Sequence, residues 1–487
     1  MNDTKKKGRL LIAGTGSGCG KTSIVCGLLR AYQKRGLALA ACKCGPDYID
    51  PLFHEKVLGI PSENLDLFFH EPGMQKQLLA RHSRGADLVV AEGVMGYYDG
   101  MSLKSPKGST SEIAAVLQMP VALVVPCRGM GHSVLALLKG YLEYETAGQI
   151  RAVILNGITG RTYEKLAPVL EQWLRENGHA VRLAGYLPKM ADAELKSRHL
   201  GLILPEEVEA LQEKLDLLAE QAEETLDLEL LLQIAEEAPD LETGEQEAGE
   251  EEGTEKPKLR IAAAKDEAFC FYYKDNLELL RQLGCEIVPF SPLHDAVLPD
   301  GIDGLILAGG YPELYAKELS ENVSMRESVL QSLEGGLPCL AECGGFLYLK
   351  EELEGEDGMM YPMTGFLKGR GYRTHTLGRF GYLTLEPKEE LLFLKRGETI
   401  RGHEFHYWDC TENGDCCLAV KPDGQRSWEC MEEKQQVFAG FAHISYDSNP
   451  AFAKRFVGCC LERREKRKCR RRHGKMRSNR SDCRMRS

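Results

Sequence analysis

The chain has 487 residues, of which 43% are hydrophobic, and a formal net charge of −12. This length allows about two to four domains, and the apolar share excludes a wholly disordered protein. No apolar run reaches the length of about 18 residues that a transmembrane helix needs, so a membrane partner is not expected. The acidic balance argues against a nucleic-acid partner for the whole chain.

The N-terminal segment, MNDTKKKGRLLIAG, is charged at first and then apolar. Its apolar part is too short for a signal peptide and continues directly into a glycine loop. We interpret it as the first strand of a cytoplasmic protein. The 17 cysteines are scattered and lack the spacing of zinc sites, so we expect most of them to be reduced structural thiols.

Short apolar runs alternate with helix-like segments, first over residues 1–235 and again over residues 258–460. Alternation of this kind is typical of a parallel sheet covered by helices on both faces. The sequence therefore predicts two α/β domains. The expected strands are Leu10–Ala13, Leu88–Ala91, Val121–Val125, Ala152–Leu155, Leu259–Ala264, Glu286–Phe290, Gly304–Leu307 and Pro338–Ala341, with a helix at Asn276–Leu283.

Two segments lack the apolar residues of a core. Residues 236–257 hold ten acidic residues and two prolines, and we interpret them as an acidic linker. Residues 461–487 carry 13 Lys and Arg against 3 acids and are expected to form a basic, disordered tail. Its role, including contact with an acidic surface, is left open.

A phosphate-binding loop follows the first expected strand. Glycine loops at a helix start let backbone N–H groups point at phosphate oxygens. Lys21 can reach the β- and γ-phosphates of ATP, and the Thr22 hydroxyl can bind Mg²⁺. The usual pattern has glycine at position 15, where this chain has Thr15. The residues expected at the nucleotide are Gly16, Gly18, Gly20, Lys21, Thr22 and Ser23.

Acidic residues follow two further segments, KCGPDYIDP at 43–51 and EGVMGYYDG at 92–100. Ligands bind at the carboxyl ends of the strands in open α/β sheets, and Mg²⁺ prefers oxygen ligands. Asp47 and Glu92 are therefore candidates to hold Mg²⁺ beside Thr22. The alternative for each acid is a solvated loop residue.

In the second domain, Cys343 lies on an expected strand-to-helix turn, in AECGGF. A cysteine on such a turn is exposed and lies beside a helix start that favours its thiolate, so we predict that it is a nucleophile. His443 is the best candidate for its base, with His403 and His406 as rivals. The backbone N–H groups of Gly309 and Gly310 are candidates for an oxyanion hole.

Several long motifs in order resemble one known family, the cobyrinic acid a,c-diamide synthases, over residues 8–458. They are KCGPDYIDP, EGVMGYYDG, RHLGL at 198–202, GGYPELYA at 309–316, AECGGF at 341–346 and RGHEFHY at 401–407. The resemblance implies a domain similar to dethiobiotin synthetase followed by a class I glutamine amidotransferase domain. It also implies amidation of the a and c carboxylates of cobyrinate, through acyl phosphates, with ATP and glutamine or ammonia in cobalamin biosynthesis.

The resemblance also implies roles for single residues. Asp50 and Asp99 would act in catalysis near the corrin carboxylate or the ammonia, and Tyr48, Asp99 and His199 would lie on the substrate. Cys343 and His443 would be nucleophile and base. Related enzymes take other carboxylates of the ring, hydrogenobyrinate or a nickel tetrapyrrole, and the residues do not distinguish the metal form of the ring. A homodimer is one option for assembly.

One position departs from the class I pattern. Many of these amidotransferases place an acid two residues after the catalytic histidine, and this chain has Ser445 there, with Asp447 as a weaker candidate. The site is therefore either a dyad or has its third member elsewhere. The alternative outside enzymology is a partner-switching ATPase, which would have no need of a thiol on a nucleophile turn.

Overall fold

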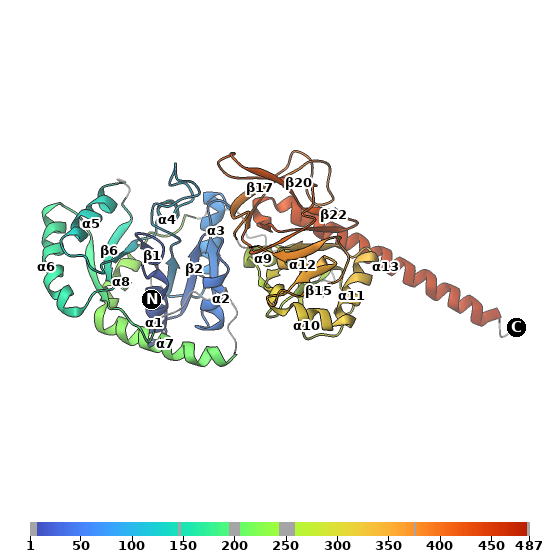
Figure 1. Cartoon of the computed structure of the whole chain (residues 1–487), viewed down its shortest axis with the longest axis horizontal. Helices are drawn as coiled ribbons and strands as arrows, with labels where there is room; N and C mark the ends of the chain where they lie inside the picture. The colour runs from blue at the N-terminus through green and yellow to red at the C-terminus, as the bar shows by residue number, and fades with distance from the viewer. Residues whose placement is uncertain (1–6, 145–147, 194–204, 243–258, 375, 485–487) are drawn as a thin grey trace, which may run out of the picture. The chain divides into compact units, whose positions relative to one another are not determined.

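The computed structural model describes residues 7–144, 148–193, 205–242, 259–374 and 376–484. The chain divides into two compact units, Met1–Ala248 and Gly249–Ser487, called unit 1 and unit 2 below (Figure 1). His199 and residues 243–257 of the predicted linker lie outside the described residues.

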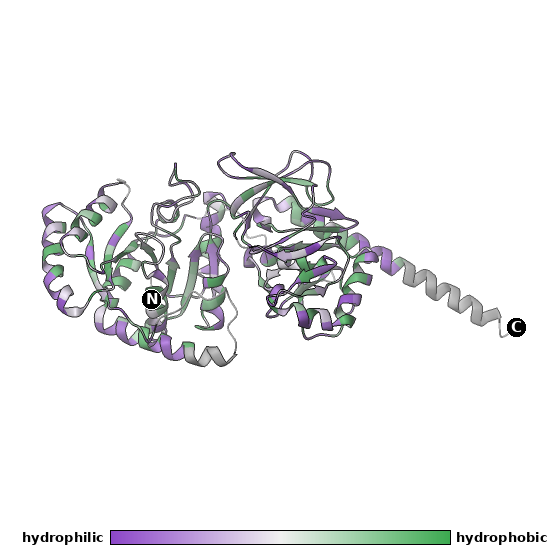
Figure 2. Ribbon diagram, in the orientation of Figure 1, coloured by the Kyte–Doolittle hydropathy of each residue, from purple (hydrophilic) through white to green (hydrophobic). Residues whose placement is uncertain are grey.

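Unit 1 is built on a seven-stranded sheet in which every neighbouring pair is parallel. Side chains alternate between the two apolar faces, as Leu10 and Leu11 do, because helices cover both sides. Figure 2 shows the hydrophobic residues along these strands. In spatial order the strands are β3 (Ser62–Leu65), β2 (Leu39–Cys44), β4 (Leu88–Glu92), β1 (Gly8–Gly14), β5 (Val121–Pro126), β6 (Ile150–Asn156) and β7 (Arg182–Leu187).

The helices of unit 1 divide between the two faces of the sheet. One core contains side chains of α1 (Lys21–Lys34), α7 (Pro205–Thr225) and α8 (Leu228–Glu236). The opposite core contains side chains of α3 (Pro72–His82), α4 (Thr110–Val116), α5 (Ser133–Glu143) and α6 (Gly160–Glu176). The short helix α2 (Ile49–Lys56) follows β2. This double cover confirms the α/β prediction for the first domain.

Unit 2 contains a six-stranded sheet that is also mainly parallel. Its strands are parallel except for β22 at one edge. In order they are β10 (Cys285–Phe290), β8 (Leu259–Ala264), β11 (Gly304–Leu307), β13 (Cys339–Glu342), β23 (Val437–Gly440) and β22 (Glu432–Lys434). The helices packed with it include α9 (Lys274–Gln282), η1 (Pro312–Tyr315), α10 (Ala316–Glu321), α11 (Val323–Glu334) and α12 (Gly344–Leu349).

Three smaller sheets complete unit 2. An antiparallel sheet has the order β21 (Ser427–Cys430), β20 (Cys417–Val420), β17 (Gly381–Pro387), β18 (Ile400–Glu404), β24 (His443–Ile444). A mixed sheet has the order β15 (Met360–Pro362), β14 (Glu352–Glu354), β16 (Arg370–Arg373), β19 (Trp408–Cys410). The strands β12 (Gly309–Gly310) and β9 (Phe269–Phe271) form a pair. The antiparallel sheet matters for the site because it carries His443.

The C-terminal residues form a long helix, α13 (Pro450–Arg484), which extends away from the rest of unit 2, where the sequence predicts a disordered tail (Figure 1). Lys and Arg are good helix formers, and the start of the helix is anchored in a core through Phe452 and Phe456. Arg467 donates to Ile302 O at 2.9 Å and pairs with Asp303 at 2.8 Å. In the described part of the chain, no helix is both long and apolar enough to cross a membrane.

Candidate active site

The phosphate loop of unit 1 connects the end of β1 to the start of α1. Gly18 and Gly20 adopt φ angles of 71° and 96°, which glycine tolerates best. A Cβ atom at Gly20 would lie 2.0 Å from Asn156 Nδ2, and that amide donates to Cys19 O at 2.8 Å. Asn156, at the end of β6, therefore holds the phosphate loop through this hydrogen bond. Thr15 is absent from the described residues with positive φ, which explains why its backbone does not require glycine.

Lys21 lies across the loop at the start of α1. Its Nζ donates to Gly16 O at 3.0 Å and to Met95 O at 2.6 Å. Both acceptors are neutral carbonyl groups, so neither one offsets the positive charge of the ammonium, which can then attract a phosphate oxygen. The second contact also joins the phosphate loop to the segment after β4, where the EGVMGYYDG motif lies.

A buried polar cluster lies where β2, β4 and α1 meet. Thr22 Oγ1 donates to Glu92 Oε1 at 2.7 Å. Lys43 pairs with the same oxygen at 2.9 Å and also with Asp50. Lys43 and Glu92 are cross-strand neighbours in the β2–β4 register. The structure thus brings together Thr22, Glu92 and Asp50 from three separate sequence motifs.

Lys43 is a member of this cluster that sequence reasoning left without a role. Lys43 begins the KCGPDYIDP motif, but the partners of a lysine in a buried strand can be identified only once the neighbouring strand and its register are known. The charges of Glu92 and Asp50 raise the pKa of Lys43, although burial alone would lower it. Lys43 therefore remains a cation that holds two carboxylates together.

Burial changes the acidity of the carboxylates. It raises the pKa of Glu92 to about 7, and the Lys43 charge opposes the rise. Burial, followed by the charge of Asp50, raises the pKa of Asp47 to about 6. Asp50 behaves differently: burial acts to raise its pKa, but the charge and hydrogen bond of Lys43, with smaller contributions from His54 and Glu92, together lower it. The cluster thus holds carboxyl groups of unequal acidity, which suits acid–base chemistry near neutral pH.

The remaining substrate-side candidates have local structural roles. Asp99 Oδ2 accepts a hydrogen bond from Gly96 N at 2.8 Å and closes its own turn. Tyr48 is buried at the start of α2. Asp47 Oδ1 accepts from Ile49 N at 2.9 Å, and Asn64 holds Asp47 O at 2.7 Å. Asp99 is therefore tied to its loop rather than to the Lys43 cluster by the contacts seen here.

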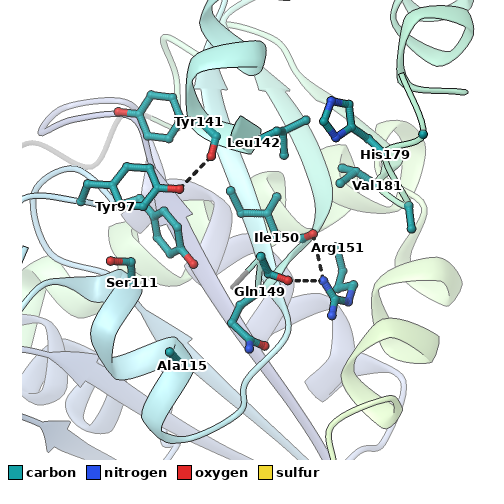
Figure 3. A pocket seen from close by; sticks show the side chains of 14 residues that line it. Tyr97, Ser111, Ala115, Tyr141, Leu142, Gln149, Ile150, Arg151, His179 and Val181 are labelled. Carbon is teal, nitrogen blue, oxygen red and sulfur yellow. Dashed lines mark hydrogen bonds between the residues drawn. The ribbon is translucent and has the colours of Figure 1, made fainter. Parts of the chain in front are cut away.

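A cavity of about 180 Å³ also opens in unit 1, and its lining contains none of the phosphate-loop residues (Figure 3). Tyr98 Oη donates to Tyr141 O at 2.7 Å, and the two rings stack at 5.6 Å. Tyr141 Oη donates to Thr15 O at 2.7 Å. The wall of this cavity is therefore hydrogen-bonded to the start of the phosphate loop, and Tyr97 N adds a second bond, to Gly14 O at 2.8 Å.

In unit 2, Cys343 forms the turn between β13 and α12. Its φ of 47° is unusual for a residue with a side chain, and strain of this kind is concentrated at functional sites. Cys343 N donates to Gly440 O at 2.7 Å. A Cβ atom at Gly345 would lie 2.1 Å from Leu307 O. Gly345 of the AECGGF motif thus lets the turn pack closely against the end of β11.

Gly309 and Gly310 lie next to the candidate nucleophile and base. A Cβ atom at Gly344 would be 3.1 Å from Gly310 N, and one at Gly309 would be 2.3 Å from His443 Cε1. The backbone of β12 therefore lies close to both the nucleophile turn and the imidazole. This position is compatible with the predicted oxyanion hole.

His443 is buried in β24, and Phe271 contacts its ring edge-on at 6.3 Å. Its Nδ1 lies 3.8 Å from Glu342 Oε2. Glu342, the residue just before Cys343, is a second functional candidate that sequence reasoning missed. The only signal was a carboxylate in a buried strand next to the nucleophile.

The rival histidines have other surroundings. His403 is the cross-strand neighbour of His443, and burial lowers its pKa to about 3. His406 stacks on Phe441 at 4.0 Å. Its Nδ1 is 2.5 Å from Trp408 O and its Nε2 is 3.5 Å from Glu404 Oε2. These contacts fix His406 in the protein interior.

The Cys343 thiol is buried, where the sequence predicts an exposed cysteine with a favoured thiolate. Burial raises the pKa of Cys343, and the charges of Glu313 and Glu404 raise it further. Burial also raises the pKa of Glu313 to about 8. A nucleophile in such surroundings needs a base to take its proton during the reaction.

Comparisons with known proteins match both units of the chain. Residues 10–203 match the CobQ/CobB/MinD/ParA nucleotide binding domain, and residues 260–451 match the CobB/CobQ-like glutamine amidotransferase domain. The cobyrinate a,c-diamide synthase of Listeria innocua is 39% identical over 92% of this chain and 99% of that protein. That of Caldanaerobacter subterraneus is 39% identical over 92% and 98%, and that of Priestia megaterium 34% over 94% and 98%. The chain therefore belongs to the cobyrinate a,c-diamide synthase family.

Proposed function

We propose that the protein amidates the a and c carboxylates of cobyrinate, with ATP to activate each carboxylate and glutamine or ammonia to supply nitrogen. The observation that carries the proposal is the presence, on one chain, of a phosphate loop beside buried carboxylates and a strained cysteine turn beside a histidine. ATP, glutamine and cobyrinate are the small-molecule partners, and we place the reaction in the cytoplasm, where ATP and glutamine are supplied.

The reaction in unit 1 has two chemical steps. A substrate carboxylate oxygen attacks the γ-phosphorus of ATP; the new P–O bond forms as the bond to ADP breaks. Ammonia nitrogen then attacks the acyl carbon, the carbon–oxygen bond to phosphate breaks, and the nitrogen releases a proton. Lys21 offsets charge on the phosphates, and the phosphate loop orients them through its backbone N–H groups.

The oxygen ligands in unit 1 fit a magnesium ion. Glu92 Oε2 is buried and has no hydrogen-bond partner among the described residues, and Thr22 Oγ1 lies 2.7 Å from the other carboxylate oxygen. Thr22, Glu92 and Asp47 are the residues that would hold the ion. When bound, Mg²⁺ neutralises phosphate charge and orients the leaving group.

Unit 2 produces the ammonia. His443 takes the Cys343 proton as the sulfur attacks the glutamine amide carbon. The carbon–nitrogen bond breaks, His443 returns the proton to the leaving ammonia, and a glutamyl thioester forms. Water, deprotonated by His443, then attacks the thioester and releases glutamate with the free thiol. The N–H groups of Gly309 and Gly310 would stabilise the oxyanion.

Phosphate release tests this proposal. The full chain is incubated with ATP, Mg²⁺ and glutamine, with and without cobyrinate, and the corrin products are followed by mass spectrometry. We expect phosphate release that depends on cobyrinate and two successive mass decreases, each that of replacing a hydroxyl with an amino group. Steady ATP hydrolysis without dependence on cobyrinate would refute the substrate assignment.

A further inference from the structure

The base of the glutaminase lacks the acid that class I amidotransferases commonly place two residues later. Ser445 occupies that position and carries no carboxylate. Its N–H donates to Arg401 O at 3.0 Å, and its carbonyl accepts from Ser448 Oγ at 2.7 Å. A catalytic histidine needs a group on its second ring nitrogen to fix its tautomer and to stabilise its protonated form.

Glu342 brings a carboxylate to that nitrogen from a different part of the chain. It is the last residue of β13, paired with Gly440 in the register of β23, and only 7% of its surface is exposed. Its Oε2 lies 3.8 Å from His443 Nδ1, and its Oε1 accepts from Ile444 N at 3.4 Å. Both oxygens thus face the His443–Ile444 strand. Catalytic contacts are often this long before substrate binds.

The histidine strand is held in this register from the other side. Asn276 Nδ2 donates to Ile444 O at 2.7 Å, and Asn276 Oδ1 accepts from Tyr446 N at 2.8 Å. The close approach of Gly309 to His443 Cε1 limits the ring further. The imidazole therefore has little freedom to turn its Nδ1 away from Glu342.

We propose that Glu342 is the positioning residue of the glutaminase, holding His443 through Nδ1 in place of the acid that Ser445 does not provide. The inference rests on the proposed function of unit 2 and extends it. With an N–H on Nδ1 directed at Glu342, the lone pair of Nε2 is left to accept the Cys343 proton. The carboxylate takes no proton itself; it stabilises the imidazolium while His443 holds the proton.

The backbone brings both residues to the same strand end. Cys343 and Glu342 are neighbours in sequence: Glu342 ends β13, and Cys343, with φ of 47°, forms the turn that follows. One strand end therefore positions both the nucleophile and the partner of the base, so any shift of β13 moves them together.

The test uses the full chain and the conservative variants Glu342→Gln and Glu342→Asp. Glu342→Gln keeps the size and one acceptor but removes the charge. We expect its kcat for glutamine-driven amidation to fall about 10²-fold, with an unchanged KM for glutamine and an unchanged rate with ammonia. Glu342→Asp is expected to recover part of kcat. The imidazole ¹⁵N shifts of His443 should report loss of the Nδ1–H tautomer in Glu342→Gln.

Asp447→Asn serves as the competing variant, because Asp447 is the nearest acid after Ser445 in sequence. A full glutamine-driven kcat in Glu342→Gln, or an equal loss of ammonia-driven rate, would overturn the inference. So would loss of kcat in Asp447→Asn with a normal Glu342→Gln. Failure of the underlying function has a different signature, namely glutamine-driven turnover that survives in Cys343→Ala.

Discussion

At the scale of single residues, buried charge dominates both sites. Lys43 lies between Glu92 and Asp50, and Glu342 lies against His443. Removing one partner of a buried pair leaves an uncompensated charge, which costs about 3–5 kcal/mol. Neutral replacements of these residues therefore need a folding control, such as thermal unfolding, beside every rate measurement.

The residues expected at each site from motifs are brought together by the structure to different extents. Thr22 and Glu92 are in direct contact, and Gly309 lies against His443. Lys43 was missed because its partner Glu92 comes from the neighbouring strand β4, and Glu342 was missed because its partner His443 lies on β24 of another sheet. Motif spacing describes what one loop presents, whereas a cross-strand pair depends on the sheet order and register.

Asp47→Asn tests the proposed ion ligands. The change removes one negative charge while keeping the side-chain shape, so we expect turnover to fall by about 10²-fold or more with either nitrogen source, together with a higher Mg²⁺ requirement. Phosphate release over a Mg²⁺ titration measures both. Glu171→Gln, an exposed position on α6, is the matched control, and full activity of Asp47→Asn would contradict the assignment.

At the scale of elements, the parallel sheets were predictable because their strands are buried on both faces and appear as unbroken apolar runs. Leu259–Ala264 and Gly304–Leu307 coincide with β8 and β11, and Asn276–Leu283 corresponds to α9 within one or two residues. The antiparallel sheet of β17, β18, β20, β21 and β24 was not predicted. Its strands are short and partly exposed, so they give no continuous apolar signal.

The cavity wall in unit 1 gives a prediction about helix α5. Tyr141→Phe removes the hydrogen bond to Thr15 O and keeps the stacking on Tyr98. We expect the KM for ATP to rise about fivefold, corresponding to a loss of roughly 1 kcal/mol for one hydrogen bond. Initial rates over an ATP titration measure it, with the exposed Tyr144→Phe as control. Equal KM values in the two variants would show that the wall does not support the loop.

A second prediction concerns the ion pair that ties helix α13 to the loop before β18. Hydrogen bonding from Arg455 lowers the pKa of Glu398 to about 2, although burial opposes this. Because the pKa in the folded state lies below that of the unfolded chain, the stabilisation is present above about pH 4.5 and is lost as pH falls toward 2. Both side chains are partly exposed, so we expect only about 0.5–1 kcal/mol.

Urea unfolding of Arg455→Met at pH 7 and pH 3 measures this contribution. The variant should be less stable than the wild type at pH 7. The difference in the free energy of unfolding should shrink at pH 3, where Glu398 is largely protonated in the unfolded chain but still ionised in the folded chain. A difference that is the same at both pH values would mean that Arg455 acts through packing rather than through its charge.

At the scale of the whole molecule, the prediction of two α/β domains with a nucleotide site and an amidotransferase site is confirmed by both domain matches and by the relatives. It was possible because each domain carries several motifs at strand ends, in a fixed order. The helical structure of residues 461–484 was not predictable, because their basic composition resembles that of a solvated tail. The ion pair of Arg467 with Asp303 shows that this part of α13 also contacts the rest of unit 2.

We propose that one chain makes ammonia at Cys343 and uses it at the Glu92 cluster. To test this, amidated corrin is measured by mass spectrometry for the wild type, Cys343→Ala and Glu92→Gln, each with glutamine and with ammonia. We expect Cys343→Ala to lose only the glutamine-driven product and Glu92→Gln to lose the product with both nitrogen sources. Loss of ammonia-driven product in a folded Cys343→Ala, or its survival at the wild-type rate in Glu92→Gln, would contradict the separation of the two roles.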